Sequence, residues 1–258
     1  MDLGLKGKKA LIAGASKNIG AAIARCLAAE GCQLFLVSRD AERLQQLCGQ
    51  LGGKQAGHHY MAVDLRIEGK PAEAAQEALR RAGNVDIVIH NVGGGLGYKD
   101  VLGPCSDWED VWQFNVGIAI EINRILIPPM RQRKWGRVVH VSSIVAQAGE
   151  PLGEFSGSLP YTAAKAYLNA YIKGIGRAVA GDNVVVSGVM PGAVRSQGKF
   201  WDRMIQEDPA KVKDFINHYY PAGRFGTAEE IAPFVALLAS QQASFASGSL
   251  IPVSGGMV

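Results

Sequence analysis

The stretch Lys8–Gly31 reads KKALIAGASKNIGAAIARCLAAEG and determines the predicted fold class. Its first part, Lys8–Ala13, is a short apolar run that predicts a buried strand ending at Gly14. Its second part, Asn18–Glu30, predicts a helix because apolar residues recur at helical spacing, at Ile19, Ala22, Ile23, Cys26 and Leu27. A glycine-rich turn between a strand and a helix lets the backbone approach a pyrophosphate at the helix N-terminus. Two glycines alone make a weak motif, since an ordinary turn between a strand and a helix could contain them as well.

The rest of the chain continues this alternation of short apolar runs with longer helical patterns. Further strands are predicted at Gln33–Ser38, Tyr60–Val63, Val85–His90, Arg137–Ser142, Asn183–Val189 and Leu250–Val253. Helices are predicted at Ala41–Gln50, Pro71–Arg81, Asp107–Arg131, Tyr161–Ala180 and, after a Thr227/Glu230 capping box, up to Ala239. Near-continuous apolar strands indicate a parallel sheet that is covered on both faces. We therefore expect an α/β fold, a doubly wound (Rossmann) parallel seven-stranded sheet with helices on both faces.

Composition limits the class of protein. The 258 residues can form one domain spanning 1–258, and we expect a small lid at about 195–221 that interrupts the alternation. The net charge of +4 comes without a concentrated basic face, so we expect no nucleic-acid partner. No segment is typical of a signal peptide or a membrane span. The four cysteines are not spaced for a metal, which predicts no metal site and free thiols in a reducing cytoplasm.

A second pattern that carries chemistry lies far from the glycine turn. Tyr161 and Lys165 are four residues apart, which places a phenol and an ammonium on one face of a helix. An ammonium nearby favours the phenolate and so lowers the pKa of the phenol. The pair means little alone, but it opens a helix directly after the strand that ends at Ser142 and Ser143.

Taken together and in order, these segments resemble the short-chain dehydrogenase/reductase family, in the compact branch that contains 3-oxoacyl (acyl-carrier-protein) reductases. The resemblance covers essentially the whole chain, and although each motif alone is weak, the ordered set is specific. The matching segments are Gly14–Gly20, Asp64–Leu65, His90–Gly93, Asn115, Val141–Ser143, Tyr161, Lys165, Pro191–Gly192, Arg224–Ile231 and Ser254–Gly256.

The resemblance implies a role for each catalytic position. Tyr161 would be the acid in carbonyl reduction and the base in alcohol oxidation. Lys165 would lower the pKa of Tyr161 and hydrogen-bond the nicotinamide ribose. Ser143, which directly precedes Ile144, would hold the substrate oxygen. Asn115 would hold a water molecule that links Lys165 to solvent.

The resemblance also implies a site for a nicotinamide dinucleotide, with Asp64 and Leu65 on its adenine side. The residues expected to contact it are Gly14, Ser16, Lys17, Asn18, Ile19, Gly20, Ser38, Arg39, Asp64, Leu65, Asn91, Gly93, Lys165, Pro191, Gly192 and Val194.

The end of the second strand decides which cofactor is expected. An NAD site places a carboxylate there to bind both ribose hydroxyls, and this chain has Ser38 instead. The next residue, Arg39, can clamp a 2′-phosphate, and Lys17 would approach the same phosphate from the glycine turn. Asp40 suits the cap of the following helix better than the ribose. We therefore predict NADP(H), with NAD(H) the alternative.

Four features depart from the family pattern. Asn18 replaces the middle glycine of the turn, where asparagine tolerates a positive φ. His90 replaces an asparagine, and we interpret it as a buried, hydrogen-bonded structural histidine. Val92 replaces an alanine and could narrow the nicotinamide pocket. The Ser143–Tyr161 interval is longer than the family commonly has, with the extra residues in Gly149–Leu159. This leaves open a substrate or partner role, or a tolerated surface insertion.

We thus expect an NADP-dependent oxidoreductase that transfers a hydride between the nicotinamide and a carbonyl or secondary alcohol carbon of a small substrate. The residues do not fix the direction. A sugar or alcohol dehydrogenase using NAD is the alternative enzyme, and a cofactor-binding regulator without catalysis is the alternative class. Apolar residues beyond one stripe on two helices, including Ile118, Ile122 and Tyr167, predict a homotetramer or homodimer.

Overall fold

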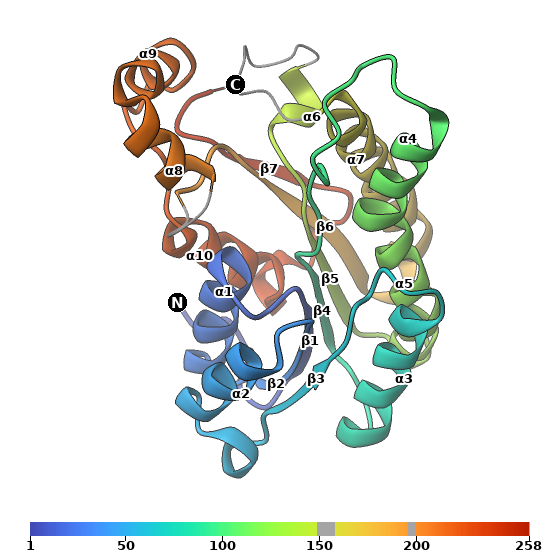
Figure 1. Cartoon of the computed structure of the whole chain (residues 1–258). Coiled ribbons are helices and arrows are strands. Elements are labelled where there is room, and N and C mark those ends of the chain that lie inside the picture. Colours follow the sequence, from blue (N-terminus) through green and yellow to red (C-terminus); the bar gives the residue numbers. More distant parts are fainter. Residues whose placement is uncertain (149–157, 196–199, 258) are drawn as a thin grey trace.

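A parallel sheet with the strand order β3-β2-β1-β4-β5-β6-β7 forms the centre of the computed structural model, which describes residues 1–148, 158–195 and 200–257 (Figure 1). The strands are β1 Lys9–Ala13, β2 Gln33–Ser38, β3 His59–Ala62, β4 Ile87–His90, β5 Gly136–Val141, β6 Val184–Pro191 and β7 Leu250–Val253. This confirms the doubly wound seven-stranded sheet, with every strand end within two residues of its predicted position.

The strand order reverses at β1, which pairs with β2 on one side and with β4 on the other. In such sheets the crevice for a ligand opens beyond the carboxyl ends of the strands at this reversal. The fold therefore places the turns after β1 and β4, which begin at Gly14 and Asn91, at the mouth of that crevice.

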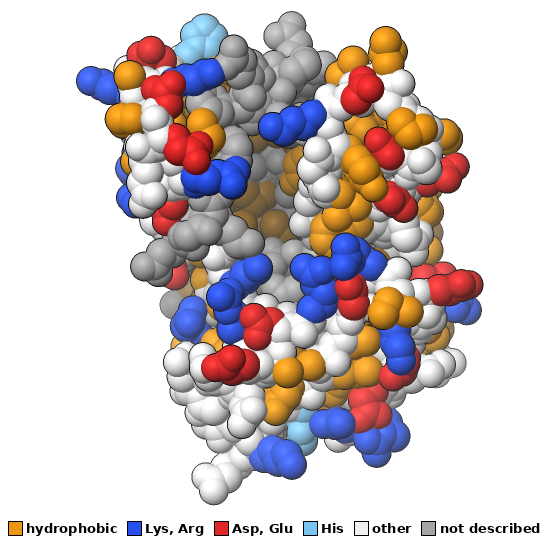
Figure 2. Space-filling model, in the orientation of Figure 1, with side chains coloured by type: hydrophobic (Ala, Val, Ile, Leu, Met, Phe, Trp, Pro, Cys, Tyr) orange, Lys and Arg blue, Asp and Glu red, His pale blue; other side chains and the backbone are white. Residues whose placement is uncertain are grey.

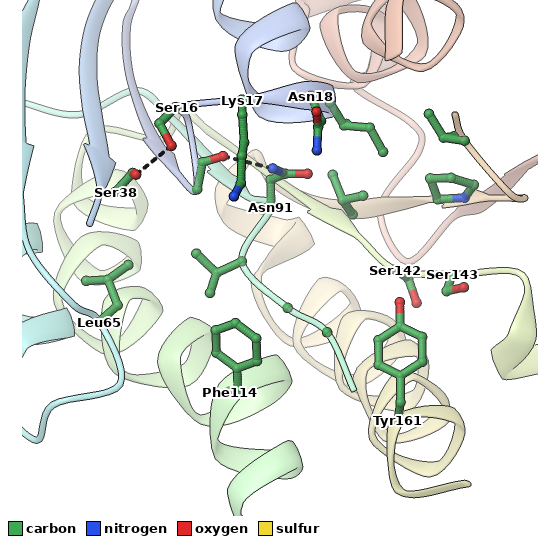
Figure 3. A pocket seen from close by; sticks show the side chains of 18 of the residues that line it. Ser16, Lys17, Asn18, Ser38, Leu65, Asn91, Phe114, Ser142, Ser143 and Tyr161 are labelled. Atoms are coloured by element: carbon green, nitrogen blue, oxygen red, sulfur yellow. Dashed lines mark hydrogen bonds between the residues drawn. The ribbon is translucent and has the colours of Figure 1, made fainter. Parts of the chain in front are cut away.

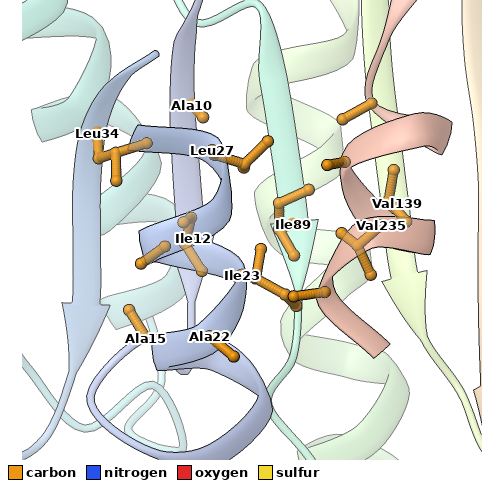
Figure 4. Packing of buried hydrophobic residues seen from close by; sticks show 14 of the residues in the cluster. Ala10, Ile12, Ala15, Ala22, Ile23, Leu27, Leu34, Ile89, Val139 and Val235 are labelled. Carbon is orange, nitrogen blue, oxygen red and sulfur yellow. The ribbon is translucent and has the colours of Figure 1, made fainter. Parts of the chain in front are cut away.

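Helices cover both faces of the sheet (Figure 1). Side chains alternate along β1, where Ala10 and Ile12 join the core beneath α1 and α10 while Leu11 and Ala13 join the core beneath α3, α5 and α7. Figure 4 shows the first core, in which Ile23 and Leu27 of α1 and Val235 of α10 pack side by side against the sheet. The helices are α1 Asn18–Ala29, α2 Ala41–Gln50, α3 Lys70–Ala82, α4 Cys105–Trp112, α5 Ile118–Gln132, α6 Val145–Ala148, α7 Leu159–Val179, α8 Phe200–Glu207, α9 Pro209–Tyr219 and α10 Ala228–Leu238.

The helix predicted at Asp107–Arg131 is not continuous, and this corrects the sequence analysis. It divides into α4, a π-helical segment η2 at Gln113–Gly117, and α5. A π-helical turn adds one residue to a helical turn and is common at functional sites. Here it contains Asn115, whose side chain lies at the catalytic centre described below.

Two features near the C-terminus shape the rim of the crevice. The Thr227/Glu230 capping box that begins α10 is present as predicted. The segment predicted to be a lid contains α8 and α9, which pack on a small apolar cluster that includes Val212, Phe215 and Phe225. No helix in the described ranges is long and apolar enough to cross a membrane.

Candidate active site

One cleft of about 720 Å³ runs along the carboxyl ends of the strands and collects nearly all of the predicted site residues (Figure 3). Its volume is typical of a cofactor or ligand pocket. Of the residues predicted to bind or react, only Gly20 and Asn115 do not line it, and both lie directly behind residues that do. Figure 2 shows a hollow at this position, with Lys and Arg side chains gathered at its rim.

The glycine turn has no room for a side chain at either glycine. Gly14 has a φ of +85°, and a Cβ there would lie 3.0 Å from the carbonyl carbon and oxygen of Asn91. A Cβ on Gly20 would lie 2.0 Å from the carbonyl oxygen of Gly14. Asn91 stabilises the turn, because its Nδ2 donates to the carbonyl oxygen of Gly14 at 2.9 Å. The turn is therefore a backbone cradle that only glycine permits.

Asn18 keeps the turn in shape although it replaces a glycine. Its φ of +50° lies in the left-handed region, which asparagine tolerates, as the sequence analysis expected. The N-cap of α1 is Lys17, whose side chain makes no capping hydrogen bond, so the first N–H groups of the helix face the cleft without a side-chain cap. A backbone cradle and an uncapped helix N-terminus together fit a pyrophosphate.

The left end of the cleft in Figure 3 is polar and basic. Ser38 Oγ donates to Ser16 Oγ at 2.7 Å, which joins the end of β2 to the glycine turn. Asp40 accepts a hydrogen bond from the backbone N–H of Arg43 at 3.0 Å and begins α2. This carboxylate is therefore used as a helix cap, as the sequence analysis preferred, and it does not line the cleft.

Ser143 and Tyr161 meet at the other end of the cleft. Figure 3 shows the hydroxyl of Tyr161 directed toward Ser142 and Ser143. Ser142 Oγ is already used, because it donates to Asn169 Oδ1 at 2.6 Å. Ser143 hydrogen-bonds Tyr161, which makes it the serine able to share a substrate oxygen with the phenol.

The pKa of Tyr161 differs from the sequence expectation. Burial raises it above its ordinary value of 10.0, and the hydrogen bond from Ser143 offsets only part of that rise. The Nζ of Lys165 lies 5.7 Å from the ring centroid of Tyr161 and donates to the carbonyl oxygen of Val141 at 2.9 Å. Burial lowers the pKa of Lys165 itself to about 8. The phenol is therefore fully protonated at neutral pH.

Asn115 is a clamp between η2 and the loop after β4. Its Oδ1 accepts from the backbone N–H of Gly94 at 3.0 Å, and its Nδ2 donates to the carbonyl oxygens of Gly94 and Val111 at 2.9 and 2.8 Å. A Cβ on Gly93 would lie 2.5 Å from Asn115 Oδ1 and 3.1 Å from Lys165 Nζ. Since both amide hydrogens are used, any water molecule held here must bind Oδ1 or the main chain.

His90 is buried and hydrogen-bonded, as predicted. Its Nε2 lies 2.8 Å from Asn123 Oδ1, and its ring stacks on that of His140 at 4.5 Å. Burial lowers its pKa to about 4, despite the hydrogen bond that Asn123 Oδ1 accepts from its ring. His90 is therefore neutral at physiological pH and supports β4 and β5 from beneath the site.

The segment after β6 is fixed over the cleft by the C-terminal signature. Val194 forms a bridge with Gly226, and the backbone N–H of Arg195 donates to the Gly226 carbonyl at 2.9 Å. Ala193 N–H donates to Tyr220 Oη at 2.9 Å. These contacts place the motif Arg224–Ile231 beside the segment after β6, although the two are about 30 residues apart in the sequence.

The sequence analysis missed several residues that line the cleft. Arg66, Leu96 and Phe114 are the clearest, and Leu96 has the unusual φ of +55°. The run Gly93–Gly97 around Leu96 was the one signal that could have indicated an unusual backbone there. The expectation for the segment Gly149–Leu159 falls on 149–157, outside the described residues, except that Ser158 caps α7 by accepting from Tyr161 N–H at 3.3 Å.

Comparison with known proteins assigns the chain to a family. A family model described as enoyl-(acyl carrier protein) reductase matches residues 14–258. Nodulation protein G of Rhizobium sp. (strain N33) is 32% identical over 256 residues, which is 98% of each chain. The 3-oxoacyl (acyl-carrier-protein) reductase FabG of Aquifex aeolicus is 29% identical over 258 residues, all of both chains.

Solved structures give the same result. L-Sorbose reductase from Gluconobacter frateurii, complexed with NADPH and L-sorbose, has a TM-score of 0.89 at 28% identity and covers 100% of this chain and 98% of its own. A 3-oxoacyl (acyl-carrier-protein) reductase from Agrobacterium tumefaciens C58 with NADP bound has a TM-score of 0.88 at 29% identity, with 99% and 96% covered. The structural similarity spans essentially the whole chain.

Proposed function

The chain belongs to the short-chain dehydrogenase/reductase family, and from that premise we propose that it uses NADPH to reduce the carbonyl group of a small substrate, with Tyr161 as the acid. It is an oxidoreductase that acts on C=O and CH–OH groups. NADPH, when bound, supplies the hydride. The chain must then position the carbonyl, donate one proton to its oxygen and hold both reactants in place.

Each catalytic residue has a place in this proposal. Ser143 holds the substrate oxygen with a hydrogen bond that strengthens as charge develops on it. Tyr161 donates its hydroxyl proton to that oxygen. Lys165, buried behind Tyr161, supplies positive charge that stabilises the resulting phenolate. Asn115 holds the loop at Gly93 and Gly94 beside Lys165, and we propose that it also takes part in proton exchange with solvent.

The observation that carries the catalytic proposal is the position of the phenol. The hydroxyl of Tyr161 is directed toward Ser143, and burial raises its pKa, so at neutral pH it can donate a proton to an oxygen held there. The same group takes the proton back when the alcohol is oxidised, so its position supports the catalytic role and does not set the direction.

The cofactor site supports NADPH over NADH. Ser38 leaves the ribose end of the cleft without a carboxylate on β2, and Asp40 serves the α2 helix cap instead. Arg39 and Lys17 line the cleft together with Ser38. Pro191, Gly192 and Val194 would cover the nicotinamide end, and α8 with α9 would form the lid.

Replacing Tyr161 by Phe tests the catalytic proposal. The variant should fold and bind NADPH as the wild type does, since it loses one hydroxyl and keeps the aromatic ring that packs against the core. Turnover on a reactive diketone or quinone should fall by about 10²–10⁴-fold, the usual contribution of general acid catalysis. Ser142→Ala is the matched control, because that hydroxyl faces Asn169 and turnover should stay within a few fold. Retention of most activity by the Phe variant would show that another group donates the proton.

We also propose a homo-oligomer and a cytoplasmic location. Tyr167 on α7 is 49% exposed and makes an edge contact with Trp112, which supports a contact surface on this side. Ile118 and Ile122 give no such support, because both are buried within the chain itself. The four free cysteines fit a reducing compartment. Light scattering on the purified protein would decide the oligomeric state, and a monomeric mass would rule the oligomer out.

A further inference from the structure

A third cation stands at the ribose end of the cleft, on a residue to which the family resemblance gives no role. Arg66 follows β3, and it lines the cleft together with Arg39 after β2 and Lys17 in the glycine turn. Because β2 and β3 are neighbouring parallel strands, their carboxyl ends lie side by side. The three cations therefore reach this end of the cleft from three different segments of the chain.

Asp64 holds Arg66 in place. The Nε of Arg66 donates to both oxygens of the Asp64 carboxylate at 3.1 and 3.2 Å, and its Nη2 donates to Oδ2 at 2.7 Å. The backbone N–H of Arg66 donates to the same carboxylate at 3.0 Å. Hydrogen bonding from Arg66 lowers the pKa of Asp64 to about 2, so the carboxylate is ionised at any working pH. The arginine is thus fixed before any ligand arrives.

The same carboxylate lies within reach of Arg39. Its Oδ2 is 3.7 Å from Arg39 Nη1, so one carboxylate stands between two guanidinium groups. A guanidinium has five N–H donors, and Arg66 uses its Nε hydrogen and one Nη2 hydrogen on Asp64. No described residue accepts from the remaining three. The side chain of Arg66 is 44% exposed, which leaves these donors open to a ligand in the cleft.

The charges at this end fit a phosphate better than a pair of hydroxyls. Lys17, Arg39 and Arg66 line this end of the cleft, and Asp64 is the one carboxylate among the described lining residues. A phosphate monoester carries about −1.5 to −2 at neutral pH and accepts hydrogen bonds on three oxygens, so it suits a site lined by three cations. A ribose with free hydroxyls brings no charge to this site.

Resting on the proposed function, we propose that Arg66 is a specificity-determining residue for NADPH, the third arm of a 2′-phosphate clamp, and that Asp64 is the positioning residue that aims it. Arg66 provides charge-assisted hydrogen bonds to the phosphate from the β3 side, opposite Lys17. The family resemblance assigns Asp64 to the adenine, but in this chain its carboxylate accepts hydrogen bonds from Arg66.

Equilibrium titrations of NADPH and NADH, followed by nicotinamide fluorescence, test this on the whole protein. In Arg66→Ala the Kd for NADPH should rise about tenfold, about 1.4 kcal/mol, while the Kd for NADH changes by less than about twofold. The Kd of Arg66→Lys for NADPH should lie between those of the wild type and Arg66→Ala, because lysine keeps the charge but lacks the planar guanidinium. Arg43→Ala is the matched control, an exposed arginine that pairs with Asp40 and does not line the cleft.

Competition with 2′-AMP and 5′-AMP locates the contact. The Arg66→Ala variant should lose affinity for 2′-AMP and keep its affinity for 5′-AMP. Equal losses for NADPH and NADH would show that Arg66 contacts only the adenine, and unchanged affinities for both would show that it contacts neither; either result overturns this inference. A wild-type preference for NADH would overturn both the proposed cofactor and the clamp. A wild-type preference for NADPH that survives in Arg66→Ala would overturn the clamp alone.

Discussion

Acidification should destabilise the fold through His90 at a higher pH than that at which Asp64, Glu77 or Glu230 becomes protonated in the folded chain. The imidazole is buried, and its pKa is lowered from 6.5 to about 4. A group whose folded pKa is depressed in this way is neutral in the fold but protonated in the unfolded chain at intermediate pH. Its stabilising contribution is therefore complete above pH 6.5 and is lost as the pH falls toward 4.

The size of the effect follows from the two pKa values. At pH 5 the unfolded histidine is almost fully protonated and the folded one almost fully neutral. Each pH unit below 6.5 therefore lowers the free energy of unfolding by ~1.36 kcal/mol, which gives about 2 kcal/mol over the 1.5 units down to pH 5. His140 shifts in the same direction because it is buried beside His90, and it adds to the loss. Asp64, Glu77 and Glu230 have pKa values of about 2 and contribute only at lower pH.

Urea unfolding at fixed protein concentration and at pH 7.5, 6.5 and 5.0 would measure this loss as a change in the free energy of unfolding. The His90→Asn variant removes the titrating ring and keeps a polar group opposite Asn123. It starts from a lower stability at pH 7.5, since the stack with His140 is gone. Its loss between pH 7.5 and 5.0 should be smaller than that of the wild type by about 2 kcal/mol. Equal losses in the two proteins, or a flat wild-type profile, would refute the assignment of a buried neutral His90.

Three further outcomes follow from contacts in the cleft. Gly20→Ala places a Cβ 2.0 Å from the Gly14 carbonyl oxygen, so the turn must open and NADPH affinity should fall by at least about tenfold in a fluorescence titration; an unchanged Kd would contradict the cradle. Asn115→Ala leaves the N–H and C=O of Gly94 without their side-chain partner. It should therefore lower the free energy of unfolding by about 1–3 kcal/mol and also reduce turnover. A loss of turnover without a loss of stability would indicate a proton-transfer role instead. The pH profile of kcat/KM for reduction should decline above a pKa of about 8 as Lys165 loses its proton, and Lys165→Arg should lack that decline; a decline beginning only near pH 10 would assign it to Tyr161.

The fold could be predicted from the sequence because local patterns and the global topology agree. The central strands are apolar runs that are buried on both faces in the structure, as in β5, where every residue is buried, whereas the edge strands β3 and β7 are only partly buried. The glycine turn was predictable for the same reason, since Gly14 and Gly20 occupy positions where any side chain collides with backbone. Asn18 departs from the expected residue type but adopts the conformation that the turn requires.

The features that could not be predicted depend on contacts between distant segments. Nothing in the sequence around Asn115 distinguishes a π-helical turn from a continuous helix, because the turn is stabilised by the loop at Gly94 that follows another strand. Arg66 looks like an ordinary surface arginine until Asp64 and the end of β2 are placed beside it. The direction of the Tyr161 pKa shift depends on how deeply the phenol is buried, which spacing alone does not give.

The cofactor end and the catalytic end of the cleft share no residue, yet the proposed reaction needs both. At one end, Lys17, Arg39 and Arg66 line the cleft near Asp64, where we propose that the 2′-phosphate binds. At the other end, the hydroxyl of Tyr161 is directed toward Ser143, so a proton donor faces the place proposed for the substrate oxygen. Because Tyr161 and Lys165 return to their starting protonation states after each turnover, they accelerate both directions of the reaction, and the concentrations of the reactants set its direction.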